Sequence, residues 1–354
     1  LFDVLCWLLR IISSVTQRFL NKIHLLKKQV FNKVTFRLPT MISTDTQTLL
    51  HQRSLKLMGN RFEISVVSDD KAWAEARIDD AVEEIRRIER LLTTFDEQSQ
   101  TCQINKMAGI APVEVDQEVF ELIERSLRIS AVTQGAFDIT YGSIDKRLWN
   151  FDTTMSSLPD PAVAKQMVRL INYKNVVLDA SARTVFLKET GMRIGFGGIG
   201  KGYAAERARQ ILKQKGVESG IVNASGDLTT WGKQPNGKPW TIGIAHPDMA
   251  SMPFSYVEVS EMAVATSGNY EKYVMINGKR YSHTIDPKTG MPVSGIKSVT
   301  IISPNAEIAD AMATPVMVMG TRVGLDLINQ MRHIACIIIE DNNRVFTSKN
   351  IRLH

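Results

Sequence analysis

The glycine-rich stretch from Arg193 to Gly202 restricts the fold of this chain more than any other feature. It reads Arg-Ile-Gly-Phe-Gly-Gly-Ile-Gly-Lys-Gly, so half of its residues are glycine. The apolar residues 192–194 before it predict a short strand, and residues 203–212 after it predict a helix. Glycines at a strand–helix junction let the backbone approach a ligand closely, and the first-turn N–H groups of a helix bind anions. The stretch therefore predicts a phosphate-binding loop.

Two known phosphate-binding patterns overlap in this stretch. The spacing Gly195-x-Gly197-x-x-Gly200 matches the dinucleotide fingerprint, but no clear β-α-β series precedes it. The spacing Gly195-x-x-x-x-Gly200-Lys201 matches most of a Walker A loop, but Gly202 occupies the position of the Mg²⁺-binding Ser or Thr. A glycine-rich turn required only for tight packing explains the same residues, so the pattern alone leaves all three interpretations open.

The distribution of charge argues against a nucleic-acid-binding domain. The chain has 43 Lys and Arg against 37 Asp and Glu, a net charge of +6. Residues 1–40 hold seven of the basic residues and one acid, so the rest of the chain is electrically balanced. A nucleic-acid-binding face needs clustered basic residues, which the main body lacks. Cys6, Cys102 and Cys336 have no CxxC spacing, which excludes a cysteine zinc site and a disulfide framework.

The first 54 residues are interpreted as an N-terminal extension of a domain that spans residues 55–354. Residues 1–15 are apolar but contain Asp3 and Arg10, so they are too short and too charged for a membrane span. The basic residues follow the apolar ones, which is the reverse of a signal peptide. Two hypotheses remain: Met41 is the true start and the upstream residues are not native, or the segment is an anchor on a membrane surface.

Residues 55–354 carry mixed helix and strand signals and predict one α+β unit with largely antiparallel sheets. Ser68-Asp-Asp70 caps a helix expected over 71–92, and Asn277-Gly278 marks a hairpin turn. Further helices are expected over 117–134, 307–319 and 321–330. Strands are expected over 61–67, 175–178, 184–187, 240–245, 255–259, 263–266, 273–276, 299–302, 335–339 and 344–346. Residues 220–228 are expected to form a strand that runs into a turn at Gly226-Asp227.

Two groups of side chains suit chemistry. Asp310 and Thr314 lie four residues apart on a predicted helix, so both point to one face, and their oxygen atoms suit a hard cation such as Mg²⁺. His283 lies in a strand and turn over residues 281–290, and a histidine can accept a proton from an incoming hydroxyl. Each group also has a structural explanation: an acid near a helix start with a Thr bonded back to a carbonyl, and a His in an Asp-Pro turn.

Seven short motifs follow one another through the chain. They are Met58-Gly, Gly135-Ala-Phe-Asp138, Gly197-Gly-Ile-Gly-Lys-Gly-Tyr-Ala204, Val222-Asn-Ala-Ser-Gly-Asp227, Ala265-Thr-Ser-Gly268, Tyr281-Ser-His-Thr-Ile-Asp-Pro-Lys-Thr-Gly290 and Asp310-Ala-Met-Ala-Thr314. Their order and spacing resemble the ApbE family, whose members are FAD:protein FMN transferases. The resemblance covers the chain from about Leu57 to the C-terminus and implies an α+β fold related to the tunnelling fold.

The resemblance also implies an activity and a set of site residues. Family members bind FAD and Mg²⁺, cleave the pyrophosphate, join FMN through a phosphoester to a Thr or Ser of a target flavoprotein, and release AMP. By position, Asp310, Thr314 and the backbone carbonyl of Gly200 match metal ligands. His283 matches the residue that activates the acceptor hydroxyl. The implied nucleotide contacts are Met58, Phe95, Ala136, Phe137, Asp138, Gly197, Gly198 and Lys201.

The sequence departs from the family pattern at three places. Gly195 stands where an Asp is frequent, Phe95 where a Tyr is common, and Ala224-Ser225 where Gly is frequent. Two alternatives to the transferase therefore stay open: an FAD pyrophosphatase that uses water as acceptor, and a flavin-binding module without catalysis. The resemblance implies a bacterial protein at the periplasmic face of the inner membrane, whereas a start at Met41 implies the cytoplasm.

Overall fold

The computed structural model describes residues 48–145, 147, 155–246, 249–268 and 273–351. The chain divides into two units, Leu1–Thr46 and Gln47–His354, and the fold given below is that of the second. The hypotheses for residues 1–40 therefore lie outside the described residues. Within the described ranges, no helix has both the length and the apolar character that crossing a membrane requires.

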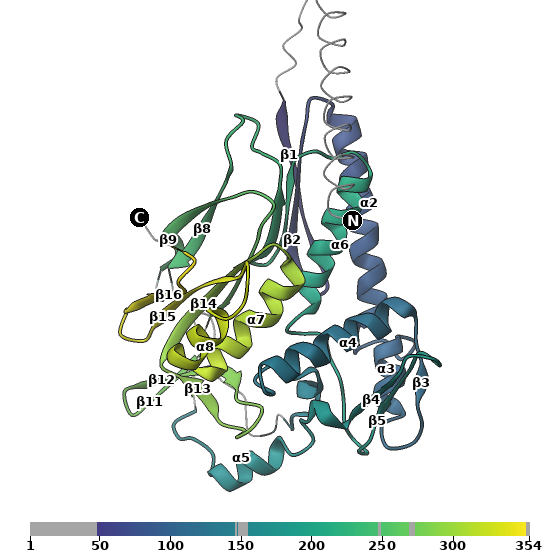
Figure 1. The fold of residues 1–354 in the computed structure, drawn as a ribbon, viewed down its shortest axis with the longest axis vertical. Coiled ribbons are helices and arrows are strands. Elements are labelled where there is room, and N and C mark those ends of the chain that lie inside the picture. The colour runs from purple at the N-terminus through teal and green to yellow at the C-terminus, as the bar shows by residue number, and fades with distance from the viewer. Residues whose placement is uncertain (1–47, 146, 148–154, 247–248, 269–272, 352–354) are drawn as a thin grey trace, which may run out of the picture. The chain divides into compact units, whose positions relative to one another are not determined.

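An eight-stranded sheet, in which every neighbouring pair is antiparallel, forms the centre of the unit (Figure 1). β1 begins at Leu49, which pairs with Ser68, so residues 49–54 belong to the folded unit and not to the expected extension. The strands, in their order across the sheet, are β1 (Leu49–Leu57), β2 (Asn60–Ser68), β6 (Gly220–Ala224), β7 (Asp227–Trp231), β10 (Ala263–Gly268), β14 (Ile296–Ser303), β15 (Ala335–Glu340) and β16 (Val345–Thr347).

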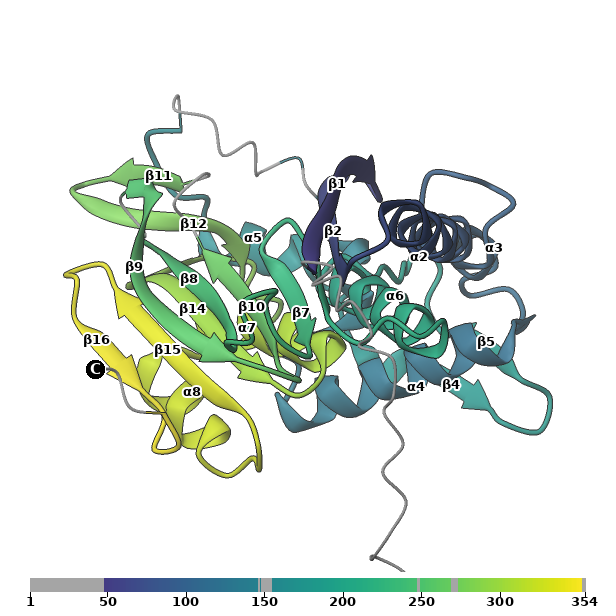
Figure 2. The same ribbon diagram turned by 90° about the horizontal axis from the view of Figure 1, so that it is seen from above.

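Helices cover one face of this sheet and a hairpin covers the other (Figure 2). The hairpin packs Trp240 and Ile242 against Val264 and Ile302. All eight residues of β14 are buried as a result, because a strand covered on both faces has no solvent side. The helices are α2 (Lys71–Leu92), α6 (Gly200–Gln214), α7 (Ala306–Met319) and α8 (Thr321–Ile328), and the hairpin strands are β8 (Trp240–His246) and β9 (Met249–Val259).

Local sequence signals account for the longest helix. The Asp70 side chain accepts the Trp73 N–H at 3.0 Å, which satisfies one of the first-turn donors of α2. Apolar residues three or four apart between Ile78 and Leu92 are buried against the sheet and the neighbouring helix. The helix expected over 71–92 is confirmed at both ends. The other four expected helices are confirmed with ends that shift by a few residues, among them the helix over 117–134 as α4 (Gln117–Val132).

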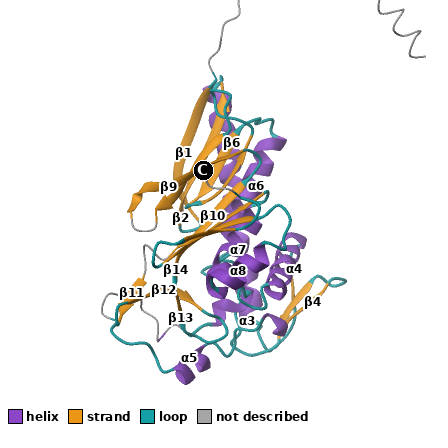
Figure 3. Ribbon diagram, turned by 60° about the vertical axis from the view of Figure 1, so that its left-hand side comes forward, coloured by secondary structure: helices purple, strands orange, loops and turns teal. Residues whose placement is uncertain are grey.

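Two three-stranded sheets and several short helices complete the unit (Figure 3). The strand orders are β3–β5–β4 and β11–β12–β13. The bounds are β3 (Val113–Glu114), β4 (Val176–Asp179), β5 (Thr184–Leu187), β11 (Tyr273–Ile276), β12 (Lys279–Ile285), β13 (Pro292–Ser294), α3 (Gln100–Lys106), α5 (Pro161–Met167), η1 (Ile139–Ser143) and η3 (Tyr173–Asn175). β12 also contacts α7, so the second small sheet is attached to the helix that carries Asp310.

Two expected strands differ in the structure. Residues 192–194 form no strand, because the Asn105 side chain, and not a neighbouring strand, bonds the N–H and C=O of Ile194 at 2.7 and 3.0 Å. The strand expected over 220–228 ends at Ala224, and the turn expected at Gly226-Asp227 lies one residue earlier, at Ser225-Gly226, where both residues have positive φ. This tight turn folds the chain back and makes Asp227 the first residue of a separate strand, β7.

Candidate functional site

The glycine-rich stretch is a loop fixed by its neighbours. The N–H of Gly195 donates to the carbonyl of Ile139 at 3.0 Å, and the N–H of Gly200 donates to Phe196 at 2.6 Å. A side chain at Gly195 or Gly197 would meet no atom within 4 Å. Neither position has a positive φ, so glycine there is not demanded by packing or by backbone conformation. The structure therefore leaves room for an Asp side chain at position 195, where the family pattern frequently has one.

The N-terminus of α6 is occupied by an acid of the protein itself. The N–H of Gly202 donates to Oδ2 of Asp310 at 2.9 Å, and the N–H of Lys201 also faces this carboxylate. Helix α6 has no side-chain cap from its own N-cap residue, so Asp310 caps it from α7. The expectation that these first-turn N–H groups bind a phosphate directly is thus corrected: they hold Asp310, because a buried carboxylate needs such donors.

The close approach of α7 explains why position 202 is glycine. A Cβ at Gly202 would lie 2.2 Å from the carbonyl oxygen of Ala306 and 2.6 Å from Cβ of Asp310. No side chain fits between the two helices at this point, so the Ser or Thr of a Walker A loop is excluded sterically. The departure from the Walker pattern therefore has a packing cause.

A second buried acid, Asp227, completes a charged cluster that the sequence did not predict. Its carboxylate forms an ion pair with the Lys201 ammonium, and it lies close enough to Asp310 for the two negative charges to interact. Burial, together with the Asp227 charge, raises the pKa of Asp310 to about 7. Asp227 appeared in the sequence only as the last residue of a motif. The signal that could have marked it is an acid placed directly after a Ser-Gly turn.

The donor atoms of this cluster fit a magnesium ion. Thr314 lies one turn after Asp310 on α7, and its hydroxyl is 3.4 Å from the hydroxyl of Ser267 on β10. Carboxylate and hydroxyl oxygens are suitable ligands for Mg²⁺, and two buried carboxylates beside one ammonium leave a negative charge that a cation offsets. Within the described ranges, no three His, Cys, Asp or Glu side chains form a metal cluster.

Two of the predicted nucleotide contacts border the loop. Cε of Met58, in the turn between β1 and β2, lies 3.7 Å from the position of a Cβ on Gly200. The Phe137 ring lies 3.5 Å from the corresponding position on Gly198. These contacts bring residues from two distant segments to the loop.

Three other predicted contacts have different surroundings. Phe95 is 97% exposed on the loop after α2. Ala136 is buried, and the Asp138 carboxylate accepts the Thr140 N–H, the Thr140 hydroxyl and the Tyr173 N–H at 2.6–2.9 Å. Burial raises the pKa of Asp138. Because both of its oxygens are bonded within the protein, Asp138 holds the segment that carries the Phe137 ring.

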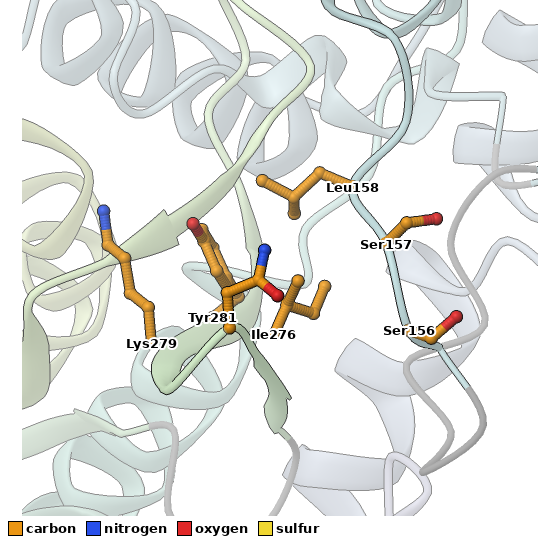
Figure 4. Close-up of a pocket in the computed structure, with 7 residues that line it drawn as sticks. Ser156, Ser157, Leu158, Ile276, Lys279 and Tyr281 are labelled. Atoms are coloured by element: carbon orange, nitrogen blue, oxygen red, sulfur yellow. The ribbon is translucent and has the colours of Figure 1, made fainter.

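His283 lies exposed on β12, and the next residue along the strand attaches this strand to α7. The Thr284 hydroxyl contacts the Met317 sulfur at 3.9 Å. Tyr281, on the same strand, lines a cavity of about 290 Å³. Figure 4 shows this cavity between the β11–β12 hairpin and the segment 156–158. Its described lining includes none of the predicted site residues.

Comparison with known proteins identifies the family. A model of the ApbE family matches residues 58–338. The chain belongs to the ApbE family. A relative named FAD:protein FMN transferase, from Klebsiella pneumoniae (strain 342), is 33% identical over 306 residues, which cover 86% of this chain and 93% of that protein. A protein of the same name from Treponema pallidum (strain Nichols) is 30% identical and covers 85% and 87% of the two chains. The prediction of a transferase is thereby confirmed.

Solved ApbE structures share the fold. The ApbE protein of Thermotoga maritima has a TM-score of 0.76 and 31% identity, with 85% of this chain and 97% of that chain covered. The apo flavinyl transferase ApbE of Pseudomonas stutzeri has a TM-score of 0.74 and 27% identity, with 86% and 96% covered. The predicted ApbE-like α+β fold is thereby confirmed.

We expect the stability of this ApbE protein to depend on pH through Asp310. Its pKa is about 7 when folded and 3.8 in an unperturbed carboxyl, so the folded state binds more protons between these values. Without a divalent cation, the free energy of unfolding should therefore fall as the pH rises from about 4 to 7. Thermal unfolding in EDTA and in Mg²⁺ checks this: the rise in Tm caused by Mg²⁺ should be larger at about pH 8 than at about pH 5. An equal rise at both pH values would contradict it.

Proposed function

We propose that this protein is a Mg²⁺-dependent FAD:protein FMN transferase, which moves FMN from FAD to a Thr or Ser hydroxyl of a target flavoprotein and releases AMP. The observation that carries the proposal is the pair of buried acids, Asp310 and Asp227, gathered at the N-terminus of α6 beside Lys201. A buried net negative charge is costly unless a cation is bound there. The names of the relatives support the choice of FAD as the substrate.

The protein's own groups supply the metal ligands and fix their direction. In this proposal Asp310, Thr314 and the Gly200 carbonyl hold Mg²⁺, which when bound neutralises charge that develops on the pyrophosphate. The Gly202 N–H keeps one Asp310 oxygen oriented. The pairing of Lys201 with Asp227 holds the ammonium near the loop, where phosphates of FAD would lie.

The exposed His283 is the proposed general base. The acceptor hydroxyl loses its proton to the imidazole while its oxygen forms a bond to the phosphorus of the FMN half. The bond from that phosphorus to the bridging pyrophosphate oxygen breaks, and AMP leaves with this oxygen. Positioning and charge neutralisation contribute most of the rate enhancement in such reactions.

The test is to incubate the purified protein with FAD, Mg²⁺ and a candidate acceptor flavoprotein. A gain of the mass of FMN, less one water, on the acceptor and an equal amount of AMP would support the transferase. FMN and AMP formed without any acceptor would favour an FAD pyrophosphatase. Tight retention of FAD without turnover would favour a flavin-binding module.

Replacing His283 with Ala should slow FMN transfer by about 10²–10⁴-fold, because a positioned general base contributes a factor of this size. The Kd for FAD should change by less than about threefold, since the imidazole acts on the acceptor hydroxyl and not on the nucleotide. Single-turnover rates and FAD titration of the same preparations measure the two effects. Equal losses in rate and in FAD affinity would indicate a structural role for His283.

A further inference from the structure

Helices α6 and α7 cap each other. The Asp310 carboxylate of α7 accepts the Gly202 N–H of α6, and the Glu206 carboxylate of α6 accepts the Ala306 N–H of α7 at 3.0 Å. In each helix the donor and the acid are four residues apart, so both lie on the face toward the other helix. The two bonds are therefore made by the same surface that brings the helices into contact at Gly202.

The cap from Glu206 satisfies a donor that α7 does not satisfy by itself. The N-cap residue of α7, Asn305, accepts the N–H of Ile308 at 3.1 Å and leaves the Ala306 N–H to Glu206. Glu206 is 5% exposed, and its second oxygen lies 3.4 Å from Nε of Arg209. A buried backbone donor needs such a partner, so moving α7 along α6 would break this bond as well as the one to Asp310.

We propose that Glu206 is a positioning residue for the metal site: it fixes α7 along its axis and thereby fixes Asp310 and Thr314. The inference rests on the proposed function, because Asp310 and Thr314 are the proposed Mg²⁺ ligands. Glu206 itself bonds α7 only at the Ala306 N–H, four residues before Asp310. Outer groups that orient metal ligands commonly change metal affinity by about 10–100-fold when they are altered.

Two conservative variants separate the position of the acceptor oxygen from its charge. Glu206→Gln keeps an oxygen at the same reach but removes the charge, so it should preserve the cap. Glu206→Asp keeps the charge but withdraws the carboxylate by one methylene, so it should lose the cap. Ser348→Ala is the matched control, because the Ser348 hydroxyl also accepts a buried backbone N–H, that of Cys336 at 2.9 Å, on the segment after β16.

The probe is Mn²⁺, a hard cation with the ligand preferences of Mg²⁺, followed through the EPR signal of the free ion without FAD. Glu206→Asp should raise the Kd for Mn²⁺ about tenfold or more, whereas Glu206→Gln and Ser348→Ala should stay within about threefold of wild type. Thermal unfolding of each protein corrects for loss of stability.

Two outcomes would overturn this inference but leave the proposed function standing. In one, Glu206→Asp binds Mn²⁺ as tightly as wild type; in the other, Glu206→Gln binds Mn²⁺ as weakly as Glu206→Asp. Absence of Mn²⁺ binding by the wild-type protein would overturn the metal site of the proposed function too.

Discussion

Replacing Asp310 with Asn is expected to lower FMN transfer by about a thousandfold or more. The substitution keeps the shape of the side chain and an oxygen that can accept the Gly202 N–H, but it removes the charge that would bind Mg²⁺. Loss of a catalytic cation costs several kcal/mol of transition-state stabilisation, and each 1.4 kcal/mol is about a factor of ten in rate. Initial rates of FMN transfer at several Mg²⁺ concentrations measure the effect.

The same variant should be more stable than wild type when no metal is present. At about pH 8 the Asp310 carboxylate is largely ionised in the wild-type protein, and burial beside Asp227 makes that charge unfavourable. Asn carries no charge, so the Tm in EDTA should rise at about pH 8 and change little at about pH 5. Asp326→Asn, which removes an exposed charge on α8, is the control and should alter neither rate nor Tm. Full transfer activity in the Asp310 variant would remove Asp310 from the metal site.

Replacing Gly202 with Ala should destabilise the protein by about 3 kcal/mol or more. Ala is normally favoured over Gly within a helix by about 1 kcal/mol. Here the added methyl would lie 2.2 Å from the Ala306 carbonyl oxygen, which is backbone and cannot rotate away. The overlap must push α7 from α6, and overpacking of a core usually costs about 1–3 kcal/mol, occasionally more. Urea unfolding with Mg²⁺ present measures the change.

Gly195→Ala is the matched control for this prediction. It makes the same substitution in the same stretch, but the new methyl would meet no atom within 4 Å and the residue has no positive φ. Its free energy of unfolding should stay within about 0.5 kcal/mol of wild type, the usual range for surface changes. If the two variants lost equal stability, the close packing of α6 on α7 would not be the reason for glycine at position 202.

The elements that the sequence predicted best are those with strong local signals. Helix α2 has a capping Asp70 and a regular apolar face, and both ends were predicted correctly. The elements that it missed are short or polar: α3 has seven residues and only Ser99 as a local signal, and β1 is an edge strand paired on one side. Their stability comes from packing and pairing with segments distant in sequence, which no local pattern records.

The proposed metal pair could be predicted because it is local. Asp310 and Thr314 belong to one helix, and the helical period alone puts them on one face. The contacts that complete the cluster are not local. Gly202 is 108 residues from Asp310, and Glu206 is 100 residues from Ala306. The bonds between them exist only because α6 and α7 pack against each other beneath the sheet.

The sequence by itself determined the glycine-rich loop, the helix that follows it and the helix that carries Asp310 and Thr314, since each depends on residues close along the chain. Only the tertiary structure decided why position 202 is glycine and what the N–H groups beside it bind. Gly202 gives α7 room to approach, and the first-turn N–H groups of α6 bind the Asp310 carboxylate. The physical reason is burial: a carboxylate removed from water must find donors, and the first-turn N–H groups of α6, which have no acceptor within their own helix, supply them.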